Sequence, residues 1–395
     1  MDKENLLLEI PYGMRDFLPQ EATAKRAVES RLAEIFAAWG YEEVVTPVME
    51  FLDTLVMGSG NNMEEHMFKF VGRDNRTLAL RHEMTTPIAR LVTGRLREEP
   101  FPLKLFYISS VYRHEEVQTG RRCEFYQAGV ELVGQNSSVA DAEILTLATA
   151  CLSASGIPTF RLNLGHVGFA GGILASCGLT AGQRKKIQHI IENKNLVKLR
   201  EYTDKLPLSD SDKEILRQIP LLCGGKDVLE RGRSLTDNPQ SLAALDNLAQ
   251  IYALCEHYGR EKNICFDLGL IRDFNYYTGM VFEIYVPTLG FPVCGGGRYD
   301  DMLTDFGRKA AATGFALGIE RLMLAMGGGL SLHSAKRKDV YVAYATEEKI
   351  VAAIAKSDEL RRTGQYVCQA LAPQTRDEAE ITRRTKGYER LVYVG

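Results

Sequence analysis

The spacing of hydrophobic and polar residues in the first part of the chain predicts helices alternating with short strands. Residues 21–39 repeat apolar side chains at helical intervals, with charges on the opposite face, and Gly40 is suited to end this helix. Residues 84–99 predict a second helix, with Thr86 as its N-cap and Pro87 in its first turn. The same pattern predicts one further helix at 140–156 and strands at 41–51, 76–81, 103–113, 124–133 and 160–166.

Strands 103–113 and 124–133 are close enough along the chain to form a hairpin. Because successive side chains of a strand point to opposite faces, Gln127, Gly129 and Glu131 share one face. A carboxylate and an amide inside a sheet need polar partners, and Gly129 leaves room between them. The hairpin therefore predicts a polar pocket.

The second half of the chain changes character twice. Residues 168–258 are mostly helical in pattern with several charged stretches, which predicts a helical insertion. Strand patterns resume in four segments, at 264–270, 277–286, 291–303 and 314–327. We expect a main domain over residues 1–326, a Gly/Ser/basic linker over 327–337 and a small α/β unit over 338–395, with a helix at 347–363.

Composition narrows the class of protein. With 45% hydrophobic and 25% charged residues, the 395-residue chain is typical of a globular protein of two or three domains. Its net charge of −3 provides no overall basic field for nucleic acid, and its eight cysteines form no CxxC pair, so we expect reduced thiols and neither metal nor cofactor. The apolar run at the N-terminus is too short for a signal or membrane segment, which predicts a cytoplasmic protein without membrane contact.

Polar residues and glycines concentrate where strands should be apolar. They do so in five segments: 80–87, 112–132, 270–279, 294–301 and 314–322. Unpaired charges within a sheet are costly, so five such segments predict that the sheet is the floor of a polar pocket. The alternative is a satisfied network of ion pairs without a ligand, formed by Glu83, Arg113, Glu131 and Arg272.

The charges of this predicted pocket suit a zwitterion. Glu83 and Thr85 could hold an ammonium group, and Arg113 and Arg272 could grip a carboxylate or phosphate with their guanidinium forks. Glu131, together with Tyr276 or Tyr277, could fix a polar ring at the bottom of the pocket.

The order of the segments resembles that of the class II aminoacyl-tRNA synthetases. The helix and strand ending at Pro47 resemble motif 1, which builds the dimer interface of that family; the hairpin with Arg113 resembles motif 2, and GFALGIERL with Arg321 resembles motif 3. LRHEMT, IRDFNYYTG and GGGRYDDML are similar, more narrowly, to the histidyl-tRNA synthetase lineage. This resemblance covers roughly residues 10–326. It implies an α+β fold, in which helices flank an antiparallel sheet, and a self-dimer. It also implies a histidine pocket lined by Glu83, Thr85, Arg113, Gln127, Glu131, Arg272, Tyr276 and Tyr277.

Two kinds of protein share this lineage. One is the enzyme, histidyl-tRNA synthetase. The other is the non-catalytic regulatory subunit of the short-form ATP phosphoribosyltransferase, which partners a separate catalytic subunit in the first step of histidine biosynthesis. The resemblance implies that such a subunit activates its partner and takes part in feedback by histidine. Another relative that senses histidine or tRNA is a third interpretation.

Four departures from the synthetase pattern favour the regulatory subunit, for which tRNA is not expected as a partner. Tyr12 precedes Gly13 where the enzyme has a basic residue, and Glu116 and Cys123 occupy a loop where positive charge would help. The RGLDYY pattern of the enzyme is replaced by RDFNYY at 272–277, and residues 338–395 are short for an anticodon-binding domain.

Two features of the enzyme are nevertheless kept. Arg113 and Arg321, which the enzyme uses on ATP phosphates, are both present and could be vestigial nucleotide contacts or scaffold residues that bridge carboxylates. The loop 115–123 is either a partner-contacting element or a solvent-exposed connection.

Overall fold

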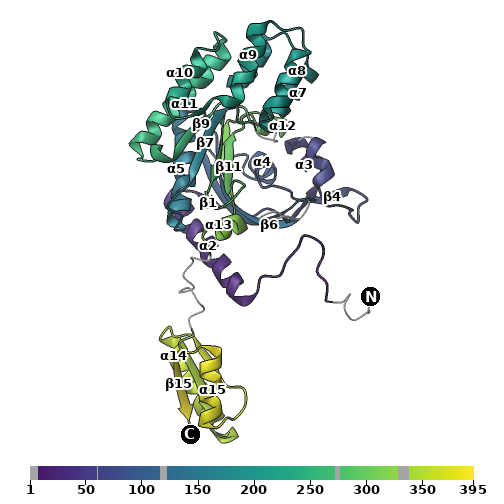
Figure 1. Cartoon of the computed structure of the whole chain (residues 1–395). Helices are drawn as coiled ribbons and strands as arrows, with labels where there is room; N and C mark the ends of the chain where they lie inside the picture. Colours follow the sequence, from purple (N-terminus) through teal and green to yellow (C-terminus); the bar gives the residue numbers. More distant parts are fainter. Residues whose placement is uncertain (1–7, 60, 116–121, 272–275, 328–337) are drawn as a thin grey trace. The chain divides into compact units, whose positions relative to one another are not determined.

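The chain divides into two compact units in the computed structural model (Figure 1). One unit holds residues 1–16 and 25–330, and the other holds residues 17–24 and 331–395. The structure describes residues 8–59, 61–115, 122–271, 276–327 and 338–395. Most of the predicted linker lies outside these residues, so the domain boundaries predicted at 326, 337 and 338 stay predictions.

A nine-stranded sheet forms the centre of the first unit, in the order β1-β5-β6-β12-β11-β10-β7-β9-β8. Its strands are β1 (Glu42–Glu43), β5 (Leu103–Tyr112), β6 (Glu124–Val133), β7 (Arg161–His166), β8 (Cys223–Gly224), β9 (Ile264–Asp267), β10 (Met280–Tyr285), β11 (Cys294–Arg298) and β12 (Ala312–Gly318). The pairs β1·β5 and β7·β9 are parallel and all other pairs are antiparallel. The predicted hairpin of β5 and β6 and the predicted α+β class are confirmed, and the expectation of an antiparallel sheet holds for all but these two pairs.

The strand predicted at 41–51 is divided between two sheets. Its first part is β1, and its last part is β2 (Met49–Phe51), which joins a separate antiparallel sheet of order β2-β4-β3 with β3 (Lys69–Val71) and β4 (Thr77–Leu80). Pro47 lies between the two parts and cannot donate a backbone hydrogen bond to a ladder. The segment 41–51 therefore contributes one short strand to each of two sheets.

Helices cover both faces of the central sheet. The first unit contains α2 (Pro19–Ala38) from Lys25 onward. Its other helices are α3 (Leu52–Ser59), η1 (Asn61–His66), α4 (Thr85–Gly94), α5 (Ser138–Ala154), α6 (Val167–Ser176), α7 (Ala181–Glu192), α8 (Leu196–Asp204), α9 (Asp210–Gln218), η2 (Ile219–Leu221), α10 (Asp227–Arg233), α11 (Pro239–His257), η3 (Glu261–Asn263), α12 (Met302–Asp305) and α13 (Ile319–Ala325). Helices α2, α5, α6 and α11 share one hydrophobic core on one face, and α4 and α12 share a second core on the other.

The alternation of β5 and β6 explains why there are two cores. Phe106, Ala128 and Val130 point into the core of α2 and α5, whereas Tyr107, the register partner of Gly129, points to the face of α4. Gln127, Gly129 and Glu131 therefore share the α4 face, as the sequence predicted.

The segment predicted as a helical insertion contains α6 to α11, and Figure 1 shows α7, α8 and α9 gathered at one end of the unit. It also contains the edge strand β8, which the helical pattern did not indicate. Helix α11 packs on α5 and α6 through Leu245, Leu248 and Ile251, so this part belongs to the main core.

The second unit has a three-stranded parallel sheet of order β14-β13-β15. Its elements are β13 (Val340–Tyr344), η5 (Glu347–Lys349), α14 (Ile350–Arg362), β14 (Val367–Gln369), α15 (Arg376–Lys386) and β15 (Arg390–Val394). Sequence analysis did not predict α15, because Ala379 is its one fully buried residue and almost all its other positions are polar. Within the described part of the chain, every helix falls short of the length and apolar character that crossing a membrane requires.

Candidate functional site

A cavity of about 140 Å³ lies on the α4 face of the central sheet. A single water needs only ~10–15 Å³ of such space, so the cavity has room for a small molecule. The predicted pocket residues that the structure describes all line it: Glu83, Thr85, Arg113, Gln127, Glu131, Tyr276 and Tyr277. The predicted Arg272 lies outside the described residues. The structure thus brings these side chains together, and their binding of histidine stays a prediction.

Small residues of two neighbouring strands form the floor of the cavity. The sheet register pairs Gly297 of β11 with Gly314 of β12, and Gly295 with Ala316. Gly318 follows on the same face, opposite Gln127. These positions share the face of Glu131 and carry at most one methyl group, so the side chains that border the cavity can approach the sheet closely. A Cβ at Gly314 would stand 2.0 Å from a carboxylate oxygen of Glu131, and one at Gly297 would stand 2.9 Å from the Tyr277 ring. The GGG and GFALG segments of the sequence therefore let Glu131 and Tyr277 pack directly on the floor of the cavity.

Gly129 has a different role from the one predicted. A Cβ at this position would stand 2.4 Å from the hydroxyl oxygen of Tyr107 and 2.3 Å from the carbonyl oxygen of Phe315. The room that the glycine leaves is thus filled by the Tyr107 ring, which is 1% exposed, and not by open cavity. Sequence analysis had not included Tyr107, although its position opposite Gly129 in the hairpin is the signal that could have found it.

Glu131 is the most deeply buried acid of the cavity, at 2% exposure. Its carboxylate accepts hydrogen bonds from the Thr85 hydroxyl at 3.0 Å and from the Tyr299 hydroxyl. Burial raises the pKa of Glu131 to about 8; the hydrogen bonds from Tyr299 and Thr85 oppose this shift, and the charge of Glu83 adds to it. At neutral pH the protonated form of this group therefore predominates, and the ionised form gains as pH approaches 8.

Glu83 caps helix α4. Its carboxylate accepts hydrogen bonds from the backbone N–H of Thr85 and, at 2.8 Å, from that of Thr86. An acid at a helix N-terminus satisfies free amides and complements the helix dipole. The prediction of Thr86 as the N-cap was therefore wrong: Met84 takes the N-cap position without a side-chain bond, and Glu83 supplies the acceptor from the residue before it.

The hydrogen-bond partners of Glu83 and Glu131 test whether these acids form an ion-pair network with arginine in the absence of a ligand. Within the described residues, Glu83 and Glu131 accept from amides and hydroxyls and not from arginine. Arg113 donates from Nε to the carbonyl oxygen of His82 at 2.8 Å, and its Nη1 lies 3.9 Å from Glu115. The described part of the predicted network is thus not formed.

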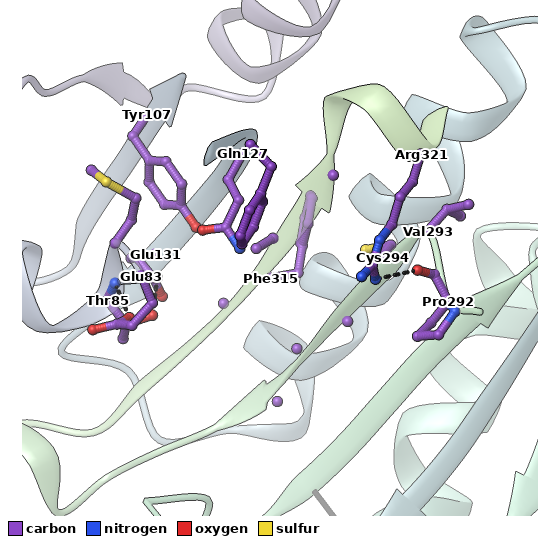
Figure 2. Close-up of a pocket in the computed structure, with 18 of the residues that line it drawn as sticks. Glu83, Thr85, Tyr107, Gln127, Glu131, Pro292, Val293, Cys294, Phe315 and Arg321 are labelled. Atoms are coloured by element: carbon purple, nitrogen blue, oxygen red, sulfur yellow. Dashed lines mark hydrogen bonds between the residues drawn. The ribbon is translucent and has the colours of Figure 1, made fainter. Parts of the chain in front are cut away.

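A guanidinium group lies on the opposite side of the cavity. Figure 2 shows Arg321 and Pro292 apart from Glu83, Thr85 and Glu131. Arg321 donates to the carbonyl oxygen of Pro292 at 2.9 Å. A cavity with acids on one side and a guanidinium on the other suits a small molecule that carries both charges.

Gln127 supplies a group that the protein leaves unused. Its side-chain carbonyl oxygen is buried and has no hydrogen-bond partner within the described part of the chain. Because a buried acceptor without a donor is destabilising, this atom marks a place for a ligand N–H or a water.

Tyrosine rings close the cavity above Glu131. The rings of Tyr276 and Tyr277 lie 4.8 Å apart, and Tyr276 meets Tyr299 edge-on at 5.8 Å. Sequence analysis quoted Tyr299 within GGGRYDDML without assigning it a role, and it did not single out Glu320, which also lines the cavity. Glu320 accepts from the backbone N–H of Tyr126 at 3.0 Å and so braces β6.

Cys123 lies at the end of the loop between β5 and β6, as the sequence indicates, but its side chain is buried. It is 1% exposed and packs against Gly13, at which a Cβ would stand 2.3 Å from its sulfur, and its N–H donates to the Gly13 carbonyl oxygen at 3.0 Å. The N-terminal segment that follows Tyr12 thus meets the end of this loop through Gly13. Glu116 lies outside the described residues, and Glu115 and Arg122 are the described loop residues that line the cavity.

Known proteins that are similar to this chain identify its family. The family model described as Histidyl-tRNA synthetase matches residues 13–322. An ATP phosphoribosyltransferase regulatory subunit from Moorella thermoacetica is 42% identical over 97% of this chain and 97% of its own. A protein of the same name from Geobacter sulfurreducens is 34% identical over 98% of this chain and 88% of its own.

Solved structures of the same lineage share the fold of this chain. A crystal structure from Bacillus halodurans, described as an ATP phosphoribosyltransferase regulatory subunit/histidyl-tRNA synthetase, superposes with a TM-score of 0.88 at 34% identity and covers 98% of both chains. Histidyl-tRNA synthetase from Nostoc shares the fold, with a TM-score of 0.81 at 22% identity over 97% of this chain and 90% of its own. The predicted class II synthetase-like fold is thereby confirmed, and the chain belongs to the family of ATP phosphoribosyltransferase regulatory subunits.

Proposed function

We propose that this chain is the non-catalytic regulatory subunit of a short-form ATP phosphoribosyltransferase, acting in the cytoplasm in the first step of histidine biosynthesis. The names of the relatives support a regulatory role, and the cavity supports a histidine effector. One observation carries the proposal: the same small cavity combines the buried acid Glu131, the guanidinium of Arg113 and the unused carbonyl oxygen of Gln127.

In the proposed complex, histidine lies across the cavity. Its imidazole meets Glu131 and the tyrosines 276 and 277, and its ammonium group meets Glu83 and Thr85. Its carboxylate faces the guanidinium of Arg113, assisted by Arg272. The buried Glu131, with its raised pKa, suits the recognition of an imidazole ring. When ionised it accepts a hydrogen bond from a ring N–H, and when protonated it donates one to an unprotonated ring nitrogen.

Regulation requires that histidine bind two states of the assembly with different affinities. Glu83 and Thr85 couple the cavity to the first turn of α4, so occupancy would bias the start of this helix. That bias passes to the catalytic partner, which transfers phosphoribosyl to ATP, while this subunit itself performs no covalent step.

A self-dimer is part of the proposal. Large apolar side chains are exposed around the motif 1-like segment, including Val45 at 81%, Met49 at 53% and Val71 at 71%. They lie on and between β1, β2 and β3, and a second copy of the chain would cover them.

Isothermal titration with histidine tests the pocket in a matched pair of variants. Thr85→Val removes the hydroxyl that donates to Glu131 and should weaken binding about tenfold, which corresponds to ~1.4 kcal/mol. Thr85→Ser keeps the hydroxyl and should bind like the wild type. Equal affinity in all three proteins would mean that histidine binds elsewhere. Activity of the short catalytic subunit, with and without this chain, tests the regulatory role separately.

An active histidine–tRNA ligase is the second candidate, because Arg113 and Arg321 both line the cavity as nucleotide contacts would. Mixing the chain with ATP, histidine and tRNA distinguishes the two functions. Rapid charging of the tRNA would overturn the regulatory proposal, whereas activation of the catalytic subunit without charging would support it.

A further inference from the structure

Two cysteine side chains meet at the edge of the central sheet, far from the cavity lining. Cys223 lies on the edge strand β8 and Cys265 on its neighbour β9, and their sulfur atoms are 3.7 Å apart. Both are partly accessible, unlike Cys151 and Cys255, which are fully buried. The residues are 42 positions apart, so no sequence motif indicates the contact.

The strand register accounts for the contact. In the antiparallel pair β8·β9, Cys223 is the partner of Asp267, and Cys265 lies two residues before Asp267 on the same face. The sulfurs therefore meet diagonally across the pair. In a disulfide the two sulfur atoms are about 2.05 Å apart. Because β8 is an edge strand of only two residues, a small shift of this strand would bring the sulfurs to that distance.

A guanidinium group stands beside this pair. The exposed Arg161 donates from Nη2 to the Cys223 sulfur at 3.3 Å and from Nε to Asn163 at 2.7 Å. Asn163 is the register partner of Cys265 in the parallel pair β7·β9, so Arg161, Asn163 and Cys265 share the same face. A cation next to a sulfur favours the negative charge that a thiol must carry when it attacks.

The two thiols are not equivalent. Burial raises the pKa of Cys265, and the neighbouring Cys223 raises it further. Cys223, with its contact to Arg161, is therefore the thiol that reacts first, and Cys265 is the one that follows. This order is that of an attacking and a resolving cysteine.

We propose that Cys223 and Cys265 are a reversible dithiol switch that is oxidised by low-molecular-weight disulfides. The Cys223 thiolate attacks one sulfur of the small disulfide, forms a mixed disulfide and releases one small thiolate. The Cys265 thiolate then attacks the Cys223 sulfur and displaces the second small thiolate. Two protein thiols and one small disulfide thus become one protein disulfide and two small thiols, so electrons and protons balance.

The new bond would tie β8 to β9 and enclose residues 224–264. This stretch contains α10 and α11, and α11 packs on α5 and α6 in the main core. In the reduced protein, β8 is joined to the sheet through two residue pairs with β9. Oxidation should therefore raise the thermal midpoint of the chain, because it closes a loop that the unfolded chain would otherwise leave open.

Peptide mapping tests the proposal on the intact wild-type chain. The reduced protein is incubated with oxidised glutathione, quenched with acid, alkylated and digested with trypsin without reductant. We expect peptide 218–226, which contains Cys223, to be linked to peptide 263–272, which contains Cys265, and the link to disappear after dithiothreitol. Separate alkylation of both cysteines, or glutathione on either without a link between them, would overturn the proposal.

Variants separate the switch from general thiol oxidation. Cys223→Ser and Cys265→Ser should each abolish the link and the rise in thermal midpoint, whereas Cys177→Ser, which removes another partly accessible thiol, should leave both unchanged. Arg161→Met should slow formation of the link several-fold while leaving both thiols in place. A rate equal to that of the wild type would remove Arg161 from the proposal.

Discussion

The hydroxyl of Tyr107 occupies the place at which any side chain on residue 129 would have to begin, 2.4 Å from the ideal Cβ position of Gly129. The two residues are register partners in the β5·β6 hairpin. The glycine is therefore a packing requirement of the cavity wall, because it leaves room for the buried Tyr107 ring against the backbone of β6.

Gly129→Ala should destabilise the chain by about 1–3 kcal/mol, because the added methyl group overpacks the site and the carbonyl oxygen of Phe315 cannot move away. Chemical denaturation measures this change. Gly182→Ala is the matched control: nothing lies within 4 Å of its Cβ position, and it lies in helix α7, so it should be neutral or stabilising. A Gly129→Ala protein as stable as the control would mean that Tyr107 readily repacks.

The raised pKa of Glu131 makes stability depend on pH. Since the folded protein holds this proton up to about pH 8 and the unfolded chain releases it near pH 4.5, stability is lost as pH rises between these values. Between about pH 5.5 and 7 the slope should approach about −1.4 kcal/mol per pH unit, and it should flatten as pH rises through 8. Glu131→Gln, which cannot titrate, should flatten it. Urea denaturation of both proteins across this window measures the difference, and identical slopes would contradict the assignment.

His82 should give the opposite dependence at acid pH. It is fully buried, both its ring nitrogens lack a partner within the described residues, and burial lowers its pKa from 6.5 to about 4. The unfolded chain therefore binds the proton more tightly, and stability falls as pH drops from 6.5 towards 4. His82→Leu should shift the acid-unfolding midpoint to lower pH, as followed by circular dichroism. His189→Leu, at an exposed position, should leave it unchanged.

A buried ion pair supports the cavity floor from the other face of the sheet. Arg298 of β11 donates to Asp141 of α5 at 2.8 Å, and both residues are at most 5% exposed. Asp141→Ala should cost about 3–5 kcal/mol, because it leaves a buried guanidinium without its main partner. Adding Arg298→Met should recover part of this loss, as a double-mutant cycle in denaturant would show. Additive losses would indicate that the pair is uncoupled.

Sequence analysis predicted the helices and strands with a clear period, and it predicted most of the cavity because Gln127 and Glu131 interrupt a strand with polar groups. It could not predict the contacts of these groups. Glu83 was assigned to a ligand, which stays a prediction, but its capping of α4 was not foreseen. The residue before the N-cap can supply the acceptor only if the chain enters the helix at a suitable angle, and the sequence does not show that angle. Helix α15 was missed because a short exposed helix with a single fully buried residue leaves no apolar stripe.

The dual position of Glu83 has a consequence for how the chain could be observed. Its two carboxylate oxygens accept hydrogen bonds from the first amides of α4 and also border the cavity. The ammonium group of a bound ligand would therefore compete with these amides for the same oxygens. The rate of hydrogen–deuterium exchange at the amides of Thr85 and Thr86 should therefore change when a ligand occupies the cavity. This measurement reports occupancy without a labelled ligand.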